Sequence, residues 1–147
     1  MKIVILIFLL SVSLYVKAQV HPFYSAANDK YGFKDATGKV VITPRYDLAY
    51  SAEEGMCAVR LNAKYGYVDQ NGTELVPPKY DYTWKFIGGY AAVKLGNKYG
   101  FIDLKGKEVI PPCYENANNY HGTCCYKGMA QVRQHGKWKL IKINPTL

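Results

Sequence analysis

Four side chains in the last third of the chain could support nucleophilic or metal chemistry: Cys113, His121, Cys124 and Cys125. A thiolate mechanism needs a base held against the sulfur and a third group that orients this base. Cys125 and His121 could supply the first two, but no catalytic signature surrounds them. The four residues could also be zinc ligands, although adjacent cysteines rarely fit the spacings of structural zinc sites. We therefore expect no enzyme, no metal site and no cofactor.

The cysteines also suit a disulfide framework, provided that the chain reaches an oxidising compartment. Four cysteines allow three complete pairings, and the sequence does not choose among them. Cys57 aligns with alanines in the repeats described below, which is typical of a small buried residue. A bridge from Cys113 to Cys124 or Cys125 would pin the longer loop of the third repeat.

Three acids recur at a fixed spacing, Asp35, Asp69 and Asp103. Recurring carboxylates could act as an acid–base pair in hydrolysis. However, each of them begins an Asp-x-x-Gly segment. An aspartate at the first turn position can accept hydrogen bonds from the backbone ahead of it, and glycine tolerates positive φ at the fourth. The sequence therefore predicts a turn role for these acids.

Basic residues also recur. Arg60, Lys94 and Arg133 share one repeat position, and a second set follows four residues later at Lys64, Lys98 and Lys137. If the repeats stack, each set forms a ladder of positive charge that could attract an anionic ligand. Alternatively, the long side chains are solvated and cover apolar neighbours. Exposed tyrosines beside such a ladder would suit glycan stacking or protein contact. The predicted binding residues are the rungs Arg60, Lys94 and Arg133 with the insertion residues Asn118, Asn119, Tyr120 and His121.

These residues belong to an internal repeat. Lys30-Tyr31-Gly32 returns as Lys64-Tyr65-Gly66 and as Lys98-Tyr99-Gly100, so the period is 34 residues. A degraded fourth start begins at Lys137. A fixed period in this range indicates one supersecondary unit stacked on copies of itself.

Each repeat is typical of β-structure. Residues 65–69 are aromatic and β-branched, a turn follows, and residues 73–76 form the return strand of a hairpin. Proline has no N–H to donate, so we expect Pro77-Pro78 to end the ladder. Residues 90–95 alternate, which places Val93 on the inner face and Ala92 on the outer one. The same alternation places Met56 outside. No window of comparable length has a sustained helical period.

The predicted fold is all-β, with three stacked 34-residue β-hairpin repeats in an antiparallel meander or solenoid-like array. The repeats span residues 30–63, 64–97 and 98–136, and a terminal partial repeat spans 137–147. An N-terminal segment, 19–29, precedes this domain of residues 30–147. Lys34 replaces an apolar residue of the inner copies, and residues 137–142 lose the glycine and the turn. Both ends are therefore expected to act as caps, and sequence drift in a surface strand is the alternative. A closed propeller would need further blades from associated chains.

Residues 1–18 are predicted to be a signal peptide, with Lys2 before an apolar stretch and Val16-Lys17-Ala18 as the cleavage site. The mature chain is then secreted or periplasmic. The formal charge is +8, and removal of Lys2 and Lys17 leaves +6. This bias suits anionic glycans, acidic proteins or membrane surfaces. Basic runs are absent, so no nucleic acid is expected, and the mature sequence has no apolar segment long enough to span a membrane.

Taken together, these residues resemble the WG-repeat, or KWG-repeat, family. The family's order of residues is found in the third copy as Gly89, Ala91, Val93, Lys98, Tyr99, Gly100, Phe101, Ile102, Asp103, Gly106, Lys107, Val109, Ile110, Pro111, Pro112 and Tyr114. Two departures stand out. The eponymous tryptophan is tyrosine in three copies and remains only as Trp138. The basic residues Arg45 and Lys79 share one repeat position, which Cys113 occupies in the third copy. The resemblance implies a β-rich interaction module without a catalytic motif.

The sequence thus predicts an exported, non-catalytic binding module that recognises a protein or an envelope glycan. A structural spacer without a ligand is the first alternative. A Cys/His-dependent envelope enzyme centred on Cys125 and His121 is the second.

Overall fold

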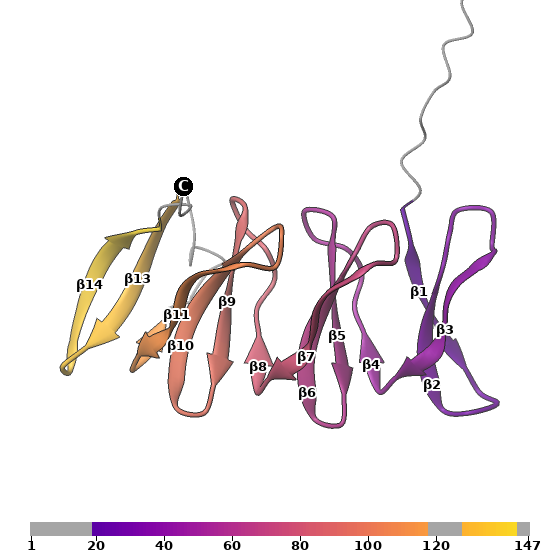
Figure 1. Cartoon of the computed structure of the whole chain (residues 1–147), viewed down its shortest axis with the longest axis horizontal. Helices are drawn as coiled ribbons and strands as arrows, with labels where there is room; N and C mark the ends of the chain where they lie inside the picture. The colour runs from indigo at the N-terminus through magenta and orange to yellow at the C-terminus, as the bar shows by residue number, and fades with distance from the viewer. Residues whose placement is uncertain (1–18, 118–127, 144–147) are drawn as a thin grey trace, which may run out of the picture.

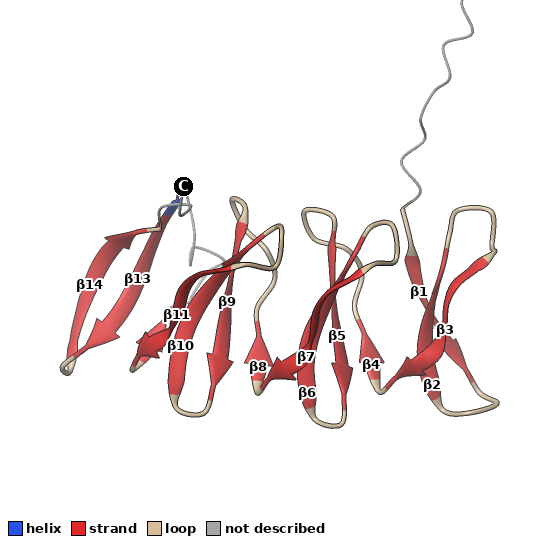
Figure 2. Ribbon diagram, viewed as in Figure 1, coloured by secondary structure: helices blue, strands red, loops and turns tan. Residues whose placement is uncertain are grey.

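The computed structural model describes residues 19–117 and 128–143. This part of the chain consists almost entirely of strands and turns and contains no α-helix; the short helical piece in Figure 2 is 3-10 helix at Gly128. The strands form four antiparallel sheets that follow one another along an elongated, open array, with the two ends of the described chain at its opposite ends (Figure 1). Among the described residues, no helix is long and apolar enough to cross a membrane.

The two inner sheets have four strands and the two outer sheets have three. The first contains β1 (His21–Ser25), β2 (Lys30–Lys34) and β3 (Val40–Tyr46). The second contains β4 (Leu48–Ala49), β5 (Met56–Leu61), β6 (Lys64–Asp69) and β7 (Glu74–Tyr80). The third contains β8 (Tyr82–Thr83), β9 (Tyr90–Leu95), β10 (Lys98–Asp103) and β11 (Glu108–Tyr114). The fourth contains β12 (Asn116–Ala117), β13 (Met129–Gln134) and β14 (Lys137–Lys142).

The all-β repeat fold predicted from the sequence is therefore confirmed. The packing units are offset from the sequence repeats, because each four-stranded sheet takes two strands from the end of one repeat and two from the start of the next. The segment that precedes the first repeat supplies the missing strand, since β1 pairs with β2 from His21–Lys34 to Ser25–Lys30. Residues 1–18 lie outside the described residues, so the signal peptide stays a prediction.

The Asp-x-x-Gly segments are turns, as predicted. Asp69 Oδ1 accepts hydrogen bonds from the backbone N of Asn71 and of Thr73, at 2.9 and 2.8 Å. Gly72 has a φ of +85°, where a side chain would be strained. Asp35 and Asp103 accept the equivalent bonds in their own turns. The recurring acids are accounted for by this local geometry.

The prediction that Pro77-Pro78 ends the ladder is wrong. β7 continues through both prolines to Tyr80, with a bulge between the pairs Tyr65–Tyr80 and Tyr67–Val76. Between these two pairs, β6 advances by two residues and β7 by four, and the extra residues of β7 form the bulge. Both prolines lie in this bulge, where the backbone N–H that proline lacks is not needed for pairing. The bulge leaves no room for a side chain at position 66, because a Cβ on Gly66 would lie 2.2 Å from the Val76 carbonyl oxygen.

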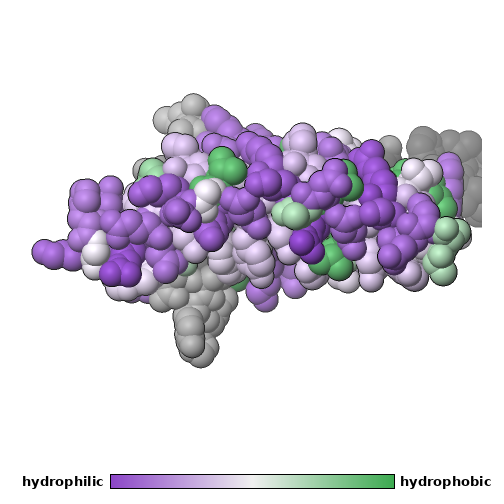
Figure 3. Space-filling model, turned by 90° about the horizontal axis from the view of Figure 1, so that it is seen from below, coloured by the Kyte–Doolittle hydropathy of each residue, from purple (hydrophilic) through white to green (hydrophobic). Residues whose placement is uncertain are grey.

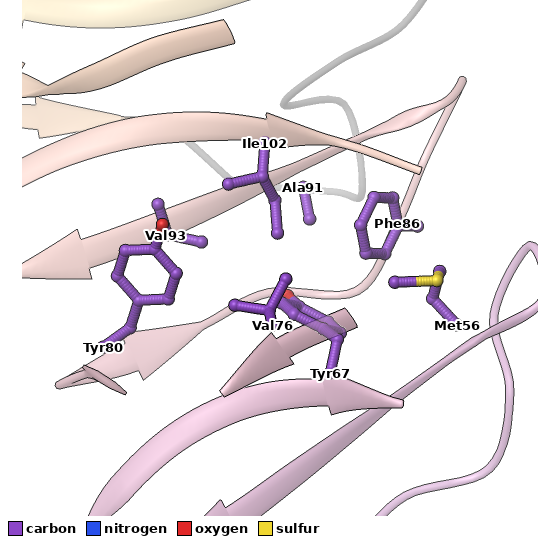
Figure 4. Packing of buried hydrophobic residues seen from close by; sticks show 8 residues of the cluster. All are labelled: Met56, Tyr67, Val76, Tyr80, Phe86, Ala91, Val93 and Ile102. Atoms are coloured by element: carbon purple, nitrogen blue, oxygen red, sulfur yellow. The ribbon is translucent and has the colours of Figure 1, made fainter. Parts of the chain in front are cut away.

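The core consists of three clusters, each located between two neighbouring sheets. The central cluster joins Met56, Tyr67, Val76 and Tyr80 of the second sheet to Ala91, Val93 and Ile102 of the third and to Phe86 of the segment between β8 and β9 (Figure 4). Ala92, the next residue on β9, packs into the cluster between the third and fourth sheets.

The inner sheets are thus covered on both faces. For this reason, the outward placement predicted for Ala92 and Met56 is wrong, and both side chains are buried. Alternation would expose every second residue only if one face of the sheet met water.

Polar clamps tie the first sheet to the second and the second sheet to the third. The Tyr46 hydroxyl donates to Glu74 Oε2 at 2.6 Å, and Arg45 binds the same oxygen at 3.0 Å. The Tyr80 hydroxyl and Lys79 bind Glu108 Oε1 in the same way, at 2.6 and 2.8 Å. Burial, with the hydrogen bond to Glu74, raises the pKa of Tyr46 to about 12. These clamps fix the stacking that positions the surface residues described next.

Candidate ligand-binding surface

The predicted rung residues lie near one edge of the array, beside the hairpin turns that connect β5 to β6 and β9 to β10. This edge is at the bottom of Figure 1. Seen from below, it is hydrophilic over most of its length, and hydrophobic patches on it are small and separate (Figure 3). The structure thus places Arg60, Lys94 and Arg133 at equivalent positions of three successive sheets.

Each rung lies directly across from an aromatic residue at the family's tryptophan position. The cross-strand pairs are Arg60–Tyr65, Lys94–Tyr99 and Arg133–Trp138. The Arg60 guanidinium carbon lies 5.8 Å from the centroid of the Tyr65 ring, and Lys94 Nζ lies 5.9 Å from that of Tyr99. A cation over an aromatic face is attracted by the ring quadrupole, so Arg60 and Lys94 each combine a positive charge with an aromatic ring.

Lys64 of the second predicted ladder is used differently, whereas Lys98 and Lys137 form no ion pair with a described residue. Lys64 pairs with Asp81, whose other carboxylate oxygen accepts a hydrogen bond from the backbone N of Gly96 in the next sheet, at 2.6 Å. The Lys64 ammonium and the Gly96 amide lower the pKa of Asp81. Lys30 and Asp47 repeat this clamp one sheet earlier, at 2.5 Å. Lys64 is therefore engaged between sheets.

Arg60 and Lys94, in contrast, have no acidic partner. Neither side chain forms a hydrogen bond or an ion pair with any residue that the structure describes, and the Arg60 Nε is buried without an acceptor among them. Arg133 Nε lies 4.0 Å from Glu115, which also accepts a hydrogen bond from Gly136. The charge of Arg60 helps to lower the pKa of Asp47, and that of Lys94 helps to lower the pKa of Asp81. Neither cation is bonded to these acids, so both can still bind an anion.

A groove of about 610 Å³ opens beside these rungs, between the second and third sheets. One wall comes from Tyr50, Ser51 and Glu53, which follow β4, and from strands β5 and β6. The other wall comes from β8 and the two residues after it. The full lining is Tyr50, Ser51, Glu53, Met56, Ala58, Tyr65, Tyr67, Tyr82, Thr83, Trp84 and Lys85.

Aromatic rings run without interruption from the second sheet to the third along this groove. The centroid of Tyr65 lies 5.3 Å from that of Tyr82, Tyr82 lies 4.8 Å from Trp84, and Trp84 lies 5.7 Å from Tyr99. The Tyr67 hydroxyl donates to the Trp84 carbonyl oxygen at 2.5 Å and fixes one wall against the other. Tyr50 and Tyr82 remain 49% and 46% exposed, so their rings can contact a ligand.

Several predicted site residues lie outside the described part of the chain. These are Asn118, Asn119, Tyr120 and His121 of the insertion, together with Cys124 and Cys125. By sequence, Asn118 takes the repeat position of Tyr50 and Trp84, both of which line the groove.

The two described cysteines differ in their surroundings. Cys113 is exposed on β11, and its predicted disulfide partners are among the residues that the structure does not describe, so this bridge stays a prediction. Cys57 is buried, as predicted, and burial raises the pKa of its thiol to about 11. In residues 19–117 and 128–143, no group of three His, Cys, Asp or Glu side chains could hold a metal ion.

The sequence did not identify the groove. Its only signal was the second aromatic segment, with Tyr82 and Trp84 two residues apart. That Tyr50 of one repeat faces these residues of the next depends on how the sheets are staggered, which the repeat period does not specify.

Four stacked sheets, with the same clamps at the first two junctions, define an open array of β-hairpin repeats. The family model described as "WG containing repeat" matches residues 31–65, 65–99 and 99–138, and the chain belongs to this family. No curated protein and no solved structure matches the chain.

Proposed function

We propose that this chain is an exported, non-catalytic binding module that recognises a protein or an envelope glycan through the cationic and aromatic edge of its array. One observation carries the proposal. The acids of this edge form ion pairs with other lysines in clamps between sheets, whereas Arg60 and Lys94 lie over aromatic rings and form no ion pair with a described residue. A buried or half-buried cation is usually paired, so these two favour an external anion.

Export and the lack of turnover are supported by the sequence alone, through the apolar leader at residues 1–18 and the absence of a catalytic signature. Export is tested by expression of the full chain in a bacterium with a cell envelope. N-terminal sequencing of the protein from the envelope or medium should begin at Gln19. Recovery of the uncleaved chain from the cytoplasm would overturn this part of the proposal.

Binding is tested by a pull-down from an envelope fraction with residues 19–147 as bait. The variant Arg60→Gln/Lys94→Gln/Arg133→Gln should lose the captured partner. Exposed rim charges act mainly on the association rate, so the partner should also bind more slowly as salt rises.

The matched control is Lys39→Gln/Lys105→Gln/Lys107→Gln, which removes the same charge from exposed residues beside the Asp-x-x-Gly turns at the opposite edge. It should retain the partner. Equal loss in both variants would indicate a general effect of net charge, and no capture by the unaltered bait would favour the spacer alternative.

A further inference from the structure

The groove between the second and third sheets combines aromatic rings, hydroxyl groups and nearby cations. Its volume of about 610 Å³ lies within the usual range for small-ligand sites. Building on the proposed function, we propose that this groove binds a pyranose unit of an acidic polysaccharide. The acidic groups of that polysaccharide would then be bound by Arg60 and Lys94.

The lining suits a sugar ring. A pyranose presents apolar C–H faces and a rim of hydroxyl groups, so it needs aromatic faces together with polar groups at the edge. The half-exposed rings of Tyr50 and Tyr82 supply the first. Ser51, Glu53 and Lys85 supply hydroxyl, carboxylate and ammonium groups on the same walls. Aromatic side chains with one apolar and one polar end are favoured at such surfaces.

The lining itself has one acid, Glu53, and one base, Lys85, so the two cations that flank the groove favour an acidic ligand. Arg60 lies across from Tyr65, and Lys94 lies across from Tyr82 on the neighbouring sheet. Both tyrosines line the groove. Successive stacked sheets are about 10 Å apart, a separation that acidic groups on one oligosaccharide chain can span. Uronate and sulfate groups share this chemistry, and the choice between them is left to the experiment.

A peptide fits this place less well. Peptides that add to a sheet need an exposed strand edge of several residues. The strands beside the groove, β4 and β8, have only two residues each, Leu48–Ala49 and Tyr82–Thr83. The groove is therefore read by side chains rather than by a backbone ladder.

The experiment is calorimetric titration of residues 19–147 with four probes of equal chain length: a polyuronate oligosaccharide, a sulfated dextran, neutral dextran and poly-glutamate. The uronate or the sulfated probe should bind, with an affinity that falls as salt rises, and neutral dextran should bind at least tenfold more weakly. The stronger of the two acidic probes identifies the acidic group.

Two pairs of variants separate stacking from charge. Tyr82→Ala should weaken binding about tenfold or more, because it removes a contact surface of the groove. Tyr24→Ala, at an exposed tyrosine of the first sheet, should leave binding unchanged. Arg60→Gln/Lys94→Gln should weaken binding more than Lys39→Gln/Lys107→Gln, which removes the same net charge elsewhere.

Circular dichroism checks the fold of each variant. If Tyr82→Ala is unfolded, Tyr50→Ala on the opposite wall replaces it. The proposal is overturned if Tyr82→Ala and Tyr24→Ala bind alike, if poly-glutamate binds as tightly as the sugars, or if no acidic probe binds. A protein partner captured by the pull-down in the last case would leave the proposed function standing and exclude the glycan.

Discussion

Gly66 is the residue where the close approach of two backbones can be tested most directly. A Cβ added there would lie 2.2 Å from the Val76 carbonyl oxygen, 2.8 Å from Pro78 N and 2.9 Å from Pro77 C. All three atoms belong to the backbone of the bulge, so no side chain can rotate away. Gly66 also lacks a positive φ, which means that the expected cost of Gly66→Ala is steric rather than conformational.

The magnitude follows from the displacement that alanine requires. Ordinary contact of a Cβ begins at 3.4 Å, so the carbonyl must retreat by about 3.4 − 2.2 = 1.2 Å. Overpacking of a rigid site costs about 1–3 kcal/mol, occasionally more, and alanine regains about 0.5–1 kcal/mol of backbone entropy. The shift also pulls on β7, whose Tyr80 holds Glu108 of the next sheet, and loss of this hydrogen bond to a charged group adds a cost of about 1.5–3 kcal/mol. We expect Gly66→Ala to lower the free energy of unfolding by about 3 kcal/mol, and Tm by on the order of 10 °C.

Urea unfolding, followed by circular dichroism and by tryptophan fluorescence, measures this effect. The matched control is Gly89→Ala, because Gly89 has a φ of +86° and open space around its Cβ position. That variant should cost about 1–2 kcal/mol, the conformational penalty alone. If Gly66→Ala costs less than Gly89→Ala, or stays within about 0.5 kcal/mol of the unaltered protein, the bulge is not the reason for this glycine.

Three further predictions concern the clamps and the last strand. Tyr46→Phe should cost about 1–2 kcal/mol at pH 7, because it loses the hydrogen bond to Glu74. Burial raises the pKa of Tyr46 to about 12, so its contribution is complete below about pH 10 and is lost as the pH rises towards 12; the variant should flatten this alkaline loss in urea midpoints measured from pH 8 to 12. Lys79 and the Tyr80 hydroxyl lower the pKa of Glu108, so its contribution is present above about pH 4.3 and disappears as the pH falls through the lower folded value; Glu108→Gln should flatten this acid loss, and an unchanged acid limb would contradict the clamp. Lys139→Gly should allow a synthetic peptide that copies residues 74–80 to pair with β14, detected as chemical-shift changes on that strand, whereas equal binding to the unaltered protein would argue against a steric block by Lys139.

Much of the fold could be predicted because it depends on interactions between residues that are close together in the sequence. The period of 34 residues, the Asp-x-x-Gly turns and the strand segments depend on neighbours along the chain, and the structure has all three. The wrong predictions came from rules that consider a single strand and ignore the strands and sheets that pack against it. Pro77-Pro78 do lack ladder donors, but a bulge accommodates that lack without ending β7. Ala92 does alternate with Val93, but both faces of β9 are covered.

The sequence predicted the rung residues of the candidate site but not the groove, because only the rungs follow from position within the repeat. Position within the repeat identified Arg60 and Lys94, because equivalent residues of stacked units must align. It could not distinguish them from Lys64, since only the structure places Asp81 against Lys64 and leaves the other two unpaired. The groove could not be predicted from the repeat, because Tyr50 and Tyr82 come from different repeats and line it together only when the second and third sheets are stacked. The Tyr80–Glu108 clamp and the buried cluster between these sheets fix their relative position.

The departures of the last copies from the repeat pattern have a common explanation in the clamps and the bulge. The cations Arg45 and Lys79 each bind a glutamate on the return strand of the following sheet. Cys113 takes their position before the fourth sheet, which has no return strand among the described residues. Lys139 takes the position of Gly66 and Gly100 on β14, opposite Val132 as Gly100 is opposite Val93. The bulged return strand of the repeat would collide with a Cβ at this position, whichever chain supplied it. Lysine on an edge strand also disfavours pairing with other chains. The clamp cation and the glycine beneath the bulge let one sheet follow another, and both are replaced in the last copies, which explains why β14 remains an edge strand. Accordingly, Leu140 is 66% exposed, whereas Phe101 at the equivalent position is fully buried.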